Sequence, residues 1–324
     1  MNNATENLTF YDYHPKPLDY YQEVLMGLEK PQPSLSPKFF YDEKGSKLFD
    51  AICECPEYYV TRTEIAILKE NIKEISQFID SDCLLIEPGS GSSEKVTILL
   101  DAIRPKAYMP MDISKDYLKL SATRIAQIYK WLEVHAACVD YTTPIEFPEG
   151  LKEINKVAFF PGSTIGNFEP GDAISFLKRI GELVDYNGGL LIGVDLKKDT
   201  DVLNKAYNDA SGYTADFNLN VLTHINRELD ADFDLSQFRH HAKYNEEHGR
   251  IEMHLISKIN QQVSVKDSLF EFMEGDSLHT EYSYKYSAEE FQQLAAEAGY
   301  HAEKCWTDAD RLFSVHFLRK MKSV

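Results

Sequence analysis

The order of apolar and amphipathic segments after residue 83 constrains the fold of this chain more than any other feature. Short apolar runs, which predict buried strands, alternate with longer segments whose apolar residues recur every three or four positions, which predict helices. We expect strands at 83–87, 107–113, 134–139, 157–161 and 190–194, and helices at 92–102, 115–129 and 172–184. Strands that alternate with helices form parallel sheets with right-handed crossovers. The pattern therefore predicts an open, mostly parallel α/β sheet.

The alternation ends after Asp195. The later pattern predicts helices at 201–210 and 217–229, antiparallel strands at 238–258 and 263–272, a helix at 287–298, and strands at 302–308 and 313–318. We expect a helical N-terminal part of a substrate lobe at 1–80, a core at 81–195, an inserted α+β substrate-binding lobe at 196–286, and a C-terminal helix and strands at 287–324. The last segment would complete the core sheet with a final antiparallel strand.

Charge and composition exclude several classes of partner. The chain has 34 Lys and Arg against 52 Asp and Glu, a net charge of −18, whereas nucleic-acid binding needs a basic patch. An acidic membrane surface is excluded for the same reason. Five scattered cysteines do not make a disulfide framework, and residues 1–21 lack the apolar region of a signal peptide. We expect a cytoplasmic protein with no nucleic-acid or membrane partner. The sequence does not report oligomeric state, and a monomer is our expectation.

A glycine-rich segment, Glu87-x-Gly89-x-Gly91, follows the first predicted strand of the sheet. Glycines at such a turn let the backbone bend sharply and approach a ligand closely. The third glycine of a dinucleotide-binding motif would stand at Glu94 and is absent. The segment therefore favours an adenosyl ligand without phosphates, although a plain tight turn remains the alternative.

Acidic residues end the next two strands, at Asp112 and at Asp140, which Tyr141 follows. An acid about 20 residues beyond the glycines can bind ribose hydroxyls, and an acid with a tyrosine can bind adenine. A helix cap at Asp112 and a simple turn at Asp140 are the alternatives. Lys95, one turn into the predicted helix, is either an exposed lysine or a partner of a ligand carboxylate. Together these residues favour S-adenosyl-L-methionine as the cofactor.

The loop after the fourth strand, residues 160–167, contains Gly162 and Asn167. It lacks the Asn/Asp-Pro-Pro-aromatic motif that many nucleic-acid amine methyltransferases carry at this place. Backbone carbonyls and one carboxamide suit a small substrate with an amine and a carboxylate. A structural glycine turn is the alternative.

From about residue 36 to its end, the chain resembles the histidine Nα-methyltransferases of the ergothioneine pathway. The resemblance rests on residues 38–42, 56–64, 89–91, 94–95, 162–167, 206–210, 218–234, 250–253 and 280–283. It implies a Rossmann-like methyltransferase sheet and the conversion of L-histidine to trimethylhistidine (hercynine) with three molecules of S-adenosyl-L-methionine. One departure is Pro88, where a leucine is usual, and proline removes a backbone donor.

The resemblance also implies roles for individual residues. The cofactor site would comprise Tyr58, Gly89, Gly91, Lys95, Asp112, Asp140 and Tyr141. The substrate site would comprise Tyr58, Gly162, Asn167 and Tyr207 around the amine and carboxylate, Met253, Glu281 and Ser283 around the imidazole, and Tyr41 and Phe49 as closing walls. We expect no metal. The catalytic hypothesis is that Asn167 and the Gly162 carbonyl orient the amine and that Tyr41 relays its proton through water.

The residues themselves support the imidazole site in part. Glu281 and Ser283 alternate on a predicted strand and so share a face, where a carboxylate and a hydroxyl can bind two imidazole nitrogens. An exposed edge strand is the alternative for this pair, and plain core packing is the alternative for Met253. Two other functions stay open: the same methylation of tyrosine or tryptophan, and a non-catalytic regulator that binds S-adenosylmethionine.

Overall fold

The computed structural model describes residues 6–13, 17–141, 147–184, 186 and 188–321. The chain folds into two compact units. The first unit contains the N-terminal strand, Val60–Lys197 and the chain from Lys285 onward, and the second contains the chain from the first helix to Tyr59 together with Lys198–Tyr284. Within the described ranges, no helix combines the length and the apolar character that a membrane crossing requires.

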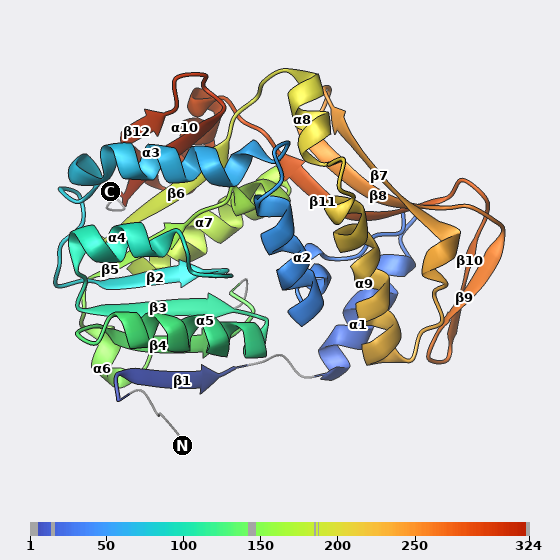
Figure 1. The fold of residues 1–324 in the computed structure, drawn as a ribbon, viewed down its shortest axis with the longest axis horizontal. Coiled ribbons are helices and arrows are strands. Elements are labelled where there is room, and N and C mark those ends of the chain that lie inside the picture. The colour runs from blue at the N-terminus through green and yellow to red at the C-terminus, as the bar shows by residue number, and fades with distance from the viewer. Residues whose placement is uncertain (1–5, 14–16, 142–146, 185, 187, 322–324) are drawn as a thin grey trace. The chain divides into compact units, whose positions relative to one another are not determined.

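An eight-stranded sheet forms the centre of the first unit, in the order β1-β4-β3-β2-β5-β6-β13-β12 (Figure 1). Its strands are β1 (Leu8–Asp12), β2 (Leu84–Pro88), β3 (Ala107–Asp112), β4 (Glu133–Cys138), β5 (Lys156–Phe160), β6 (Gly189–Asp195), β12 (Tyr300–Thr307) and β13 (Phe313–Lys320). Strands β1 to β6 pair in parallel, while β13 lies antiparallel between β6 and β12. The predicted fold class, a Rossmann-like sheet with an antiparallel last strand, is confirmed.

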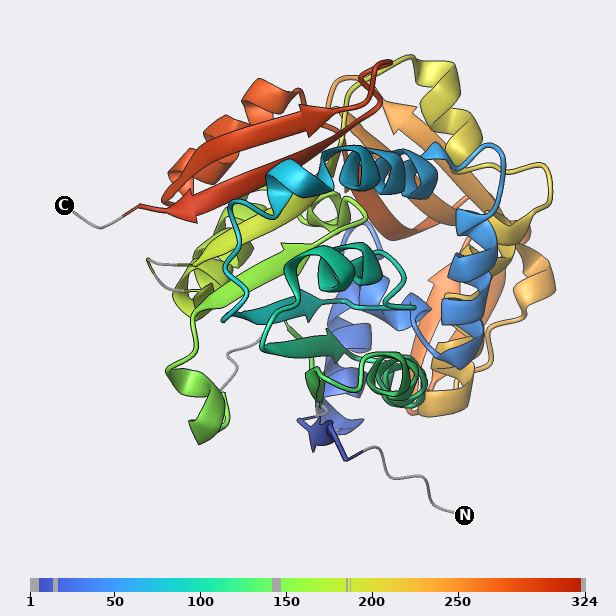
Figure 2. The same ribbon diagram turned by 60° about the vertical axis from the view of Figure 1, so that its left-hand side comes forward.

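Helices cover both faces of this sheet. They are α3 (Tyr59–Ile75), α4 (Val96–Ile103), α5 (Lys115–Ile128), α6 (Glu149–Lys152), α7 (Pro170–Val184) and α10 (Ala288–Glu297). Figures 1 and 2 show α3, α4 and α5 on one face and α7 and α10 on the other. Helix α10 begins with a capping box, in which the Ser287 side chain accepts from the Glu290 N–H and the Glu290 side chain accepts from the Ser287 N–H. Sequence periodicity predicted α4, α5, α7 and α10, because each buries one apolar stripe on the sheet. The four-residue helix α6 was not predicted.

Two local features of the first unit differ from the sequence prediction. Strand β1 was not predicted; it pairs with β4, and the Asn7 side chain donates to the carbonyl oxygen of Leu132 at 2.8 Å. The helix expected at 92–102 begins only at Val96, because Gly91 and Ser93 both have positive φ angles of 50° and 54°. Lys95 is consequently the N-cap residue of α4 rather than a residue one turn inside it.

The second unit combines helices with a three-stranded antiparallel sheet in the order β11-β8-β7 and a separate β9–β10 hairpin. Its elements are α1 (Pro17–Leu28), η1 (Pro37–Phe40), α2 (Glu43–Cys53), α8 (Thr200–Ala206), α9 (Tyr213–Leu229), η3 (Leu235–Gln237), β7 (Phe238–Asn245), β8 (Arg250–Ser257), β9 (Gln261–Val265), β10 (Ser268–Phe272) and β11 (Ser277–Tyr284). The antiparallel strands expected at 263–272 correspond to the β9–β10 hairpin, in which the chain reverses at Lys266, whose φ is 50°.

Polar contacts of Asp42 link the helices α2 and α9 of the second unit. Asp42 caps α2 by accepting from the Gly45 N–H at 2.7 Å, and it also accepts from Asn220 and Arg227 of α9, both at 2.9 Å. Burial raises the pKa of Asp42, but these hydrogen bonds outweigh burial and leave the pKa below its usual value. The Asp42 carboxylate therefore caps the N-terminus of α2 and also binds the neighbouring helix α9.

The boundaries of the two units divide the N-terminal region differently from the expected 1–80 segment. Strand β1 and helix α3 belong to the first unit. Helix α3 joins the sheet because Glu74 accepts from Lys304 at 2.6 Å and from the Trp306 indole at 2.7 Å, both on β12. At the other end, the second unit stops at Tyr284 rather than at residue 286.

Candidate active site

The glycine loop of the first unit leaves β2 at the carboxyl edge of the sheet. Gly89 and Gly91 have φ angles of 67° and 50°, which other residues adopt only with strain. The N–H groups of Gly89 and Ser90 donate to the Met111 carbonyl at 2.7 and 3.0 Å, so the loop folds over the end of β3. A Cβ atom added to Gly91 would meet no heavy atom within 4 Å, and the buried Ser90 hydroxyl has no partner among the described residues. The loop thus offers open space and an unused polar group.

Asp112 at the end of β3 contacts the same loop. Its carboxylate accepts from the Gly91 N–H at 3.1 Å and from the Ser114 N–H at 2.9 Å. The predicted alternative of a helix cap is therefore part of its role, since Ser114 is the N-cap residue of α5. Burial raises the pKa of Asp112, and the backbone donors offset that rise only in part.

Asp140 and Tyr141 follow β4 at the same edge. The Tyr141 ring lies against the glycine loop, because a Cβ on Gly89 would be 3.4 Å from its Cε1 atom. The ring also makes edge contacts with Phe160 and Phe176, each at a centroid separation of 6.1 Å. Gly89, Asp112 and Asp140 therefore end three neighbouring parallel strands, which is where open α/β sheets bind ligands.

Glu64 of α3 connects the glycine loop with the loop after β5. Its carboxylate, which is 0% exposed, forms an ion pair with Lys95 at 2.6 Å. It also accepts from the Gly162 N–H, at 2.9 Å to Oε2 and 3.1 Å to Oε1. No role was predicted for Glu64 from the sequence. In the sequence, Glu64 stands out only as the last residue of the stretch 56–64, which resembles the family.

The loop after β5 holds the predicted amine-binding residues. Gly162 and Ser163 have φ angles of 81° and 59°, and the short helix η2 (Thr164–Asn167) follows. The Ser163 hydroxyl accepts from the Asp195 N–H at 2.8 Å, and Asp195 forms a buried ion pair with Lys285 at 2.8 Å. These contacts anchor the loop to the end of β6 and leave Asn167 half-buried at its far end.

The carboxyl group of Glu87 is buried near the end of β2, next to the glycine loop. Burial raises the pKa of Glu87 to about 8, although the hydrogen bond from the Tyr108 hydroxyl lowers it in part. The same tyrosine hydroxyl is 3.2 Å from the Ser93 hydroxyl. Through Tyr108, the first residue of the Glu87-x-Gly89-x-Gly91 motif is therefore connected to Ser93, which follows the glycines.

In the second unit, the predicted substrate residues form one group. Aromatic rings follow one another from Tyr41 to Phe49 at 6.0 Å, from Phe49 to Tyr58 at 6.2 Å, and from Tyr58 to Tyr207 at 6.3 Å. Phe217 of α9 packs against Tyr41 and Phe49 at 5.6 and 5.9 Å, and sequence reasoning did not select it. Burial, together with the nearby Tyr207, raises the pKa of Tyr58 well above its usual value. The group is a cluster of contacting aromatic rings, three of which carry hydroxyl groups.

Strand β11 supplies the polar side of this group. The Tyr207 hydroxyl donates to the Ser283 hydroxyl at 2.8 Å. Glu281 pairs across the sheet with Met253 of β8, and Ser283 pairs with Ile251, so all four side chains share one face. Both predicted imidazole ligands are buried, at 7% and 3% exposure, which excludes the alternative of an exposed edge strand.

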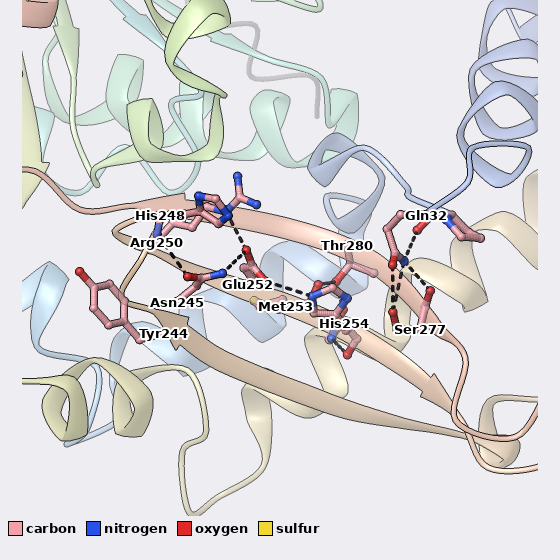
Figure 3. Close-up of polar contacts among 12 residues, drawn as sticks. Gln32, Tyr244, Asn245, His248, Arg250, Glu252, Met253, His254, Ser277 and Thr280 are labelled. Carbon is pink, nitrogen blue, oxygen red and sulfur yellow. Dashed lines mark hydrogen bonds and ion pairs between the residues drawn. The ribbon is translucent and has the colours of Figure 1, made fainter.

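The opposite face of the same sheet carries polar contacts among Arg250, Glu252 and Asn245 (Figure 3). Arg250 donates to Glu252 at 2.8 Å and lies 3.5 Å from the centre of the Tyr282 ring, while Asn245 donates to Glu252 at 3.2 Å. These contacts tie β7, β8 and β11 together. They stiffen the strands that present Met253, Glu281 and Ser283 on the other face.

The residues of the first unit fit an adenosyl cofactor with an amino-acid tail. The fit rests on the open space at Gly91, the unpartnered Ser90 hydroxyl and the acids that end β3 and β4. No group of three or more His, Cys, Asp or Glu suited to a metal ion occurs in the described part of the chain. The fold and these residues define an S-adenosylmethionine-dependent methyltransferase.

Comparison with known protein families then places the chain more narrowly. The family model described as "Histidine-specific methyltransferase, SAM-dependent" matches residues 20–320. The chain therefore belongs to this family.

Individual relatives agree with this placement. The chain is 41% identical over 294 residues to a histidine N-alpha-methyltransferase of Mycobacterium tuberculosis, covering 89% of this chain and 90% of that protein. It is 32% identical over 291 residues to ergothioneine biosynthesis protein 1 of Neurospora crassa, covering 87% of this chain but only 32% of that protein. An L-tryptophan methyltransferase of Psilocybe serbica is 27% identical over 334 residues, covering 91% of each chain.

Proposed function

We propose that this protein transfers three methyl groups, one at a time, to the α-amino group of L-histidine and releases Nα,Nα,Nα-trimethylhistidine. The observation that carries the proposal is the buried pair Glu281 and Ser283 on one face of β11, next to Met253 and the aromatic group. A carboxylate accepts from one imidazole nitrogen, and a hydroxyl can donate to or accept from the other. An indole has a single N–H donor, so tryptophan can use only one of these two groups.

The cofactor assignment within this proposal uses the first unit. Gly89, Gly91, Asp112, Asp140 and Tyr141 would hold the adenosyl part, and Lys95 would bind the carboxylate of the methionine tail. The family resemblance adds Tyr58 to the residues that bind the cofactor. S-adenosyl-L-methionine supplies an electrophilic methyl group on a sulfonium. Pro88 pairs with Met111 at the end of β2 and leaves the glycines and their contacts in place.

The protein's task is to present an unprotonated amine in line with that methyl group. Asn167 and the Gly162 carbonyl would orient the nitrogen, and Tyr207 would hold the substrate carboxylate. A free α-amino group has a pKa of ~8 or above, and transfer from water into a buried site lowers this pKa. Tyr41 would pass the released proton to water. Correct positioning can supply roughly 7–11 kcal/mol of the barrier reduction.

The wider setting follows from the same proposal. Trimethylhistidine would serve as the first intermediate on the route to ergothioneine. The net charge of −18 supports a small-molecule substrate in place of nucleic acid, and we propose a cytoplasmic monomer. Sedimentation of the purified protein tests the monomer, because a dimer would double the sedimenting mass.

A competition experiment tests the substrate. The protein is incubated with S-adenosylmethionine and an equimolar mixture of histidine, tyrosine and tryptophan, and the products are separated by mass spectrometry. Methylation of histidine alone supports the proposal. If tryptophan or tyrosine is methylated in larger amount than histidine, that amino acid is the substrate. If none of the three is methylated, the result favours a non-catalytic regulator.

A further inference from the structure

We propose that Glu64 is a positioning residue that holds both the cofactor lysine, Lys95, and the loop that orients the substrate amine. The inference rests on the proposed function for the roles of Lys95 and Gly162. The contacts among the three residues do not depend on those roles. All three residues belong to the first unit.

The contacts of Glu64 are unusual for a helix glutamate. The side chain is fully buried in α3, yet both of its carboxylate oxygens accept hydrogen bonds from other elements. Oε2 pairs with the Lys95 ammonium at 2.6 Å, and the Gly162 N–H lies within 3.1 Å of each oxygen. The two groups it binds are themselves adjacent, since a Cβ on Gly162 would be 3.6 Å from Lys95 Nζ.

The sheet makes room for this carboxylate. A Cβ on Gly193 of β6 would lie 2.0 Å from Glu64 Oε1, so a larger residue there would displace the carboxylate. A buried carboxylate is costly unless it is paired and hydrogen-bonded. The first unit therefore encloses Glu64 in a recess, pairs it with one cation and gives it one backbone donor.

This arrangement predicts two effects from one residue. The Lys95 ammonium has three donors, and its bond to Glu64 fixes the flexible side chain while leaving donors for a ligand carboxylate. The bond from the Gly162 N–H fixes the loop whose carbonyl would orient the substrate amine. Removal of the Glu64 charge should weaken cofactor binding and histidine binding together, whereas loss of a purely structural contact would lower only stability.

The test uses binding as well as turnover. Glu64→Gln keeps the size of the side chain and an oxygen for the Gly162 N–H but loses the charge. We expect it to weaken binding of S-adenosylhomocysteine, measured by calorimetry, about tenfold and to raise the KM for histidine, because hydrogen bonds to charged groups are the stronger ones. Glu70→Gln is the matched control, since Glu70 is an exposed glutamate on the same helix.

A double-mutant cycle separates positioning from general damage. In a Lys95→Met background, Glu64→Gln should change the affinity for S-adenosylhomocysteine less than about twofold, because the shared interaction is already lost. Equal losses in both backgrounds would overturn the inference. Unchanged affinity and KM in the single variant would overturn it as well.

Two further outcomes are distinguishable. Should Glu64→Gln fail to fold, Glu64→Asp retains the charge but is one methylene shorter, and it should lose affinity for S-adenosylhomocysteine; wild-type affinity and KM in that variant would contradict the inference. Wild-type protein that neither binds S-adenosylhomocysteine nor methylates histidine refutes the proposed function. Active wild type with Glu64→Gln equal to Glu70→Gln refutes only the role of Glu64.

Discussion

Tyr207 donates its hydroxyl hydrogen to the side-chain oxygen of Ser283 across 2.8 Å. The bond joins the C-terminal end of α8 to β11 and fixes the hydroxyl that lies two residues from Glu281. The hydrogen bond thus fixes the Ser283 hydroxyl in its place beside the aromatic group by a contact within the protein itself. Preorganised groups of this kind spend less free energy on ordering when the ligand arrives.

Replacement of Glu281 should affect histidine binding selectively. We expect Glu281→Ala to raise the KM for histidine roughly 10- to 100-fold, because a hydrogen bond to a charged group contributes about 1.5–3 kcal/mol. The affinity for S-adenosylhomocysteine should stay unchanged. Steady-state kinetics and calorimetry measure the two quantities, with Glu274→Ala, an exposed glutamate of the same unit, as the control. A wild-type KM would remove Glu281 from the imidazole site.

Replacement of Asn167 should affect the rate constant kcat. We expect Asn167→Ala to lower kcat about 100-fold, because misplacement of a reacting group by about 1 Å has an effect of that size. Binding of S-adenosylhomocysteine should not change, and Asp172→Ala at an exposed position of α7 should behave as wild type. If kcat survives the change, the amine lies elsewhere.

The glycine loop should not tolerate a side chain at Gly91. Gly91→Ala places a Cβ in the open space of the loop and imposes a φ of 50°, so we expect a loss of about 1–2 kcal/mol in unfolding free energy and weaker binding of S-adenosylhomocysteine. Gly171→Ala is the matched control, because Gly171 also has open space but an ordinary helical φ within α7. It should stabilise the protein by about 0.4–1 kcal/mol. Equal effects of the two variants in urea unfolding would refute the strain at Gly91.

Glu87 should make stability depend on pH. The folded protein keeps the Glu87 proton up to a pKa of about 8, whereas the unfolded chain releases it near the ordinary glutamate pKa of 4.5. Between these values the folded state binds more protons, so this group lowers the unfolding free energy as pH rises from about 4.5 to 8.

Glutamine mimics the protonated acid at every pH. The stability of Glu87→Gln relative to wild type should therefore increase across the same interval, as measured by urea unfolding at several pH values. Glu94→Gln, at an exposed position in the same loop, is the control variant. A constant difference for Glu87→Gln would show that Glu87 is ionised in the folded protein.

Local patterns in the sequence predicted the parts of the fold that depend on short segments. The buried strands and amphipathic helices of the sheet have clear periodicity, and Gly89, Asp112 and Asp140 stand at strand ends, where the topology alone brings them to one edge. Glu281 and Ser283 share a face because they alternate on a strand.

Other features depend on contacts between distant residues and left no local signal. Glu64 looks like any helix glutamate, because its partners lie 31 and 98 positions away. Strand β1 has five residues and is defined by its pairing with β4. The start of α4 at Val96 depends on the backbone angles of the preceding loop. Phe217 is one of many aromatic residues until α9 packs beside Tyr41 and Phe49.

The central claim is that the α-amino nitrogen of histidine receives all three methyl groups. Tandem mass spectrometry of the product made from histidine and S-adenosylmethionine tests it directly, because fragmentation separates the α-amino group from the imidazole ring. We predict a final product with three methyl groups on the α-nitrogen and an unmodified ring. Methyl groups on the imidazole, or a product that stops at one α-methyl group with cofactor in excess, would contradict the account.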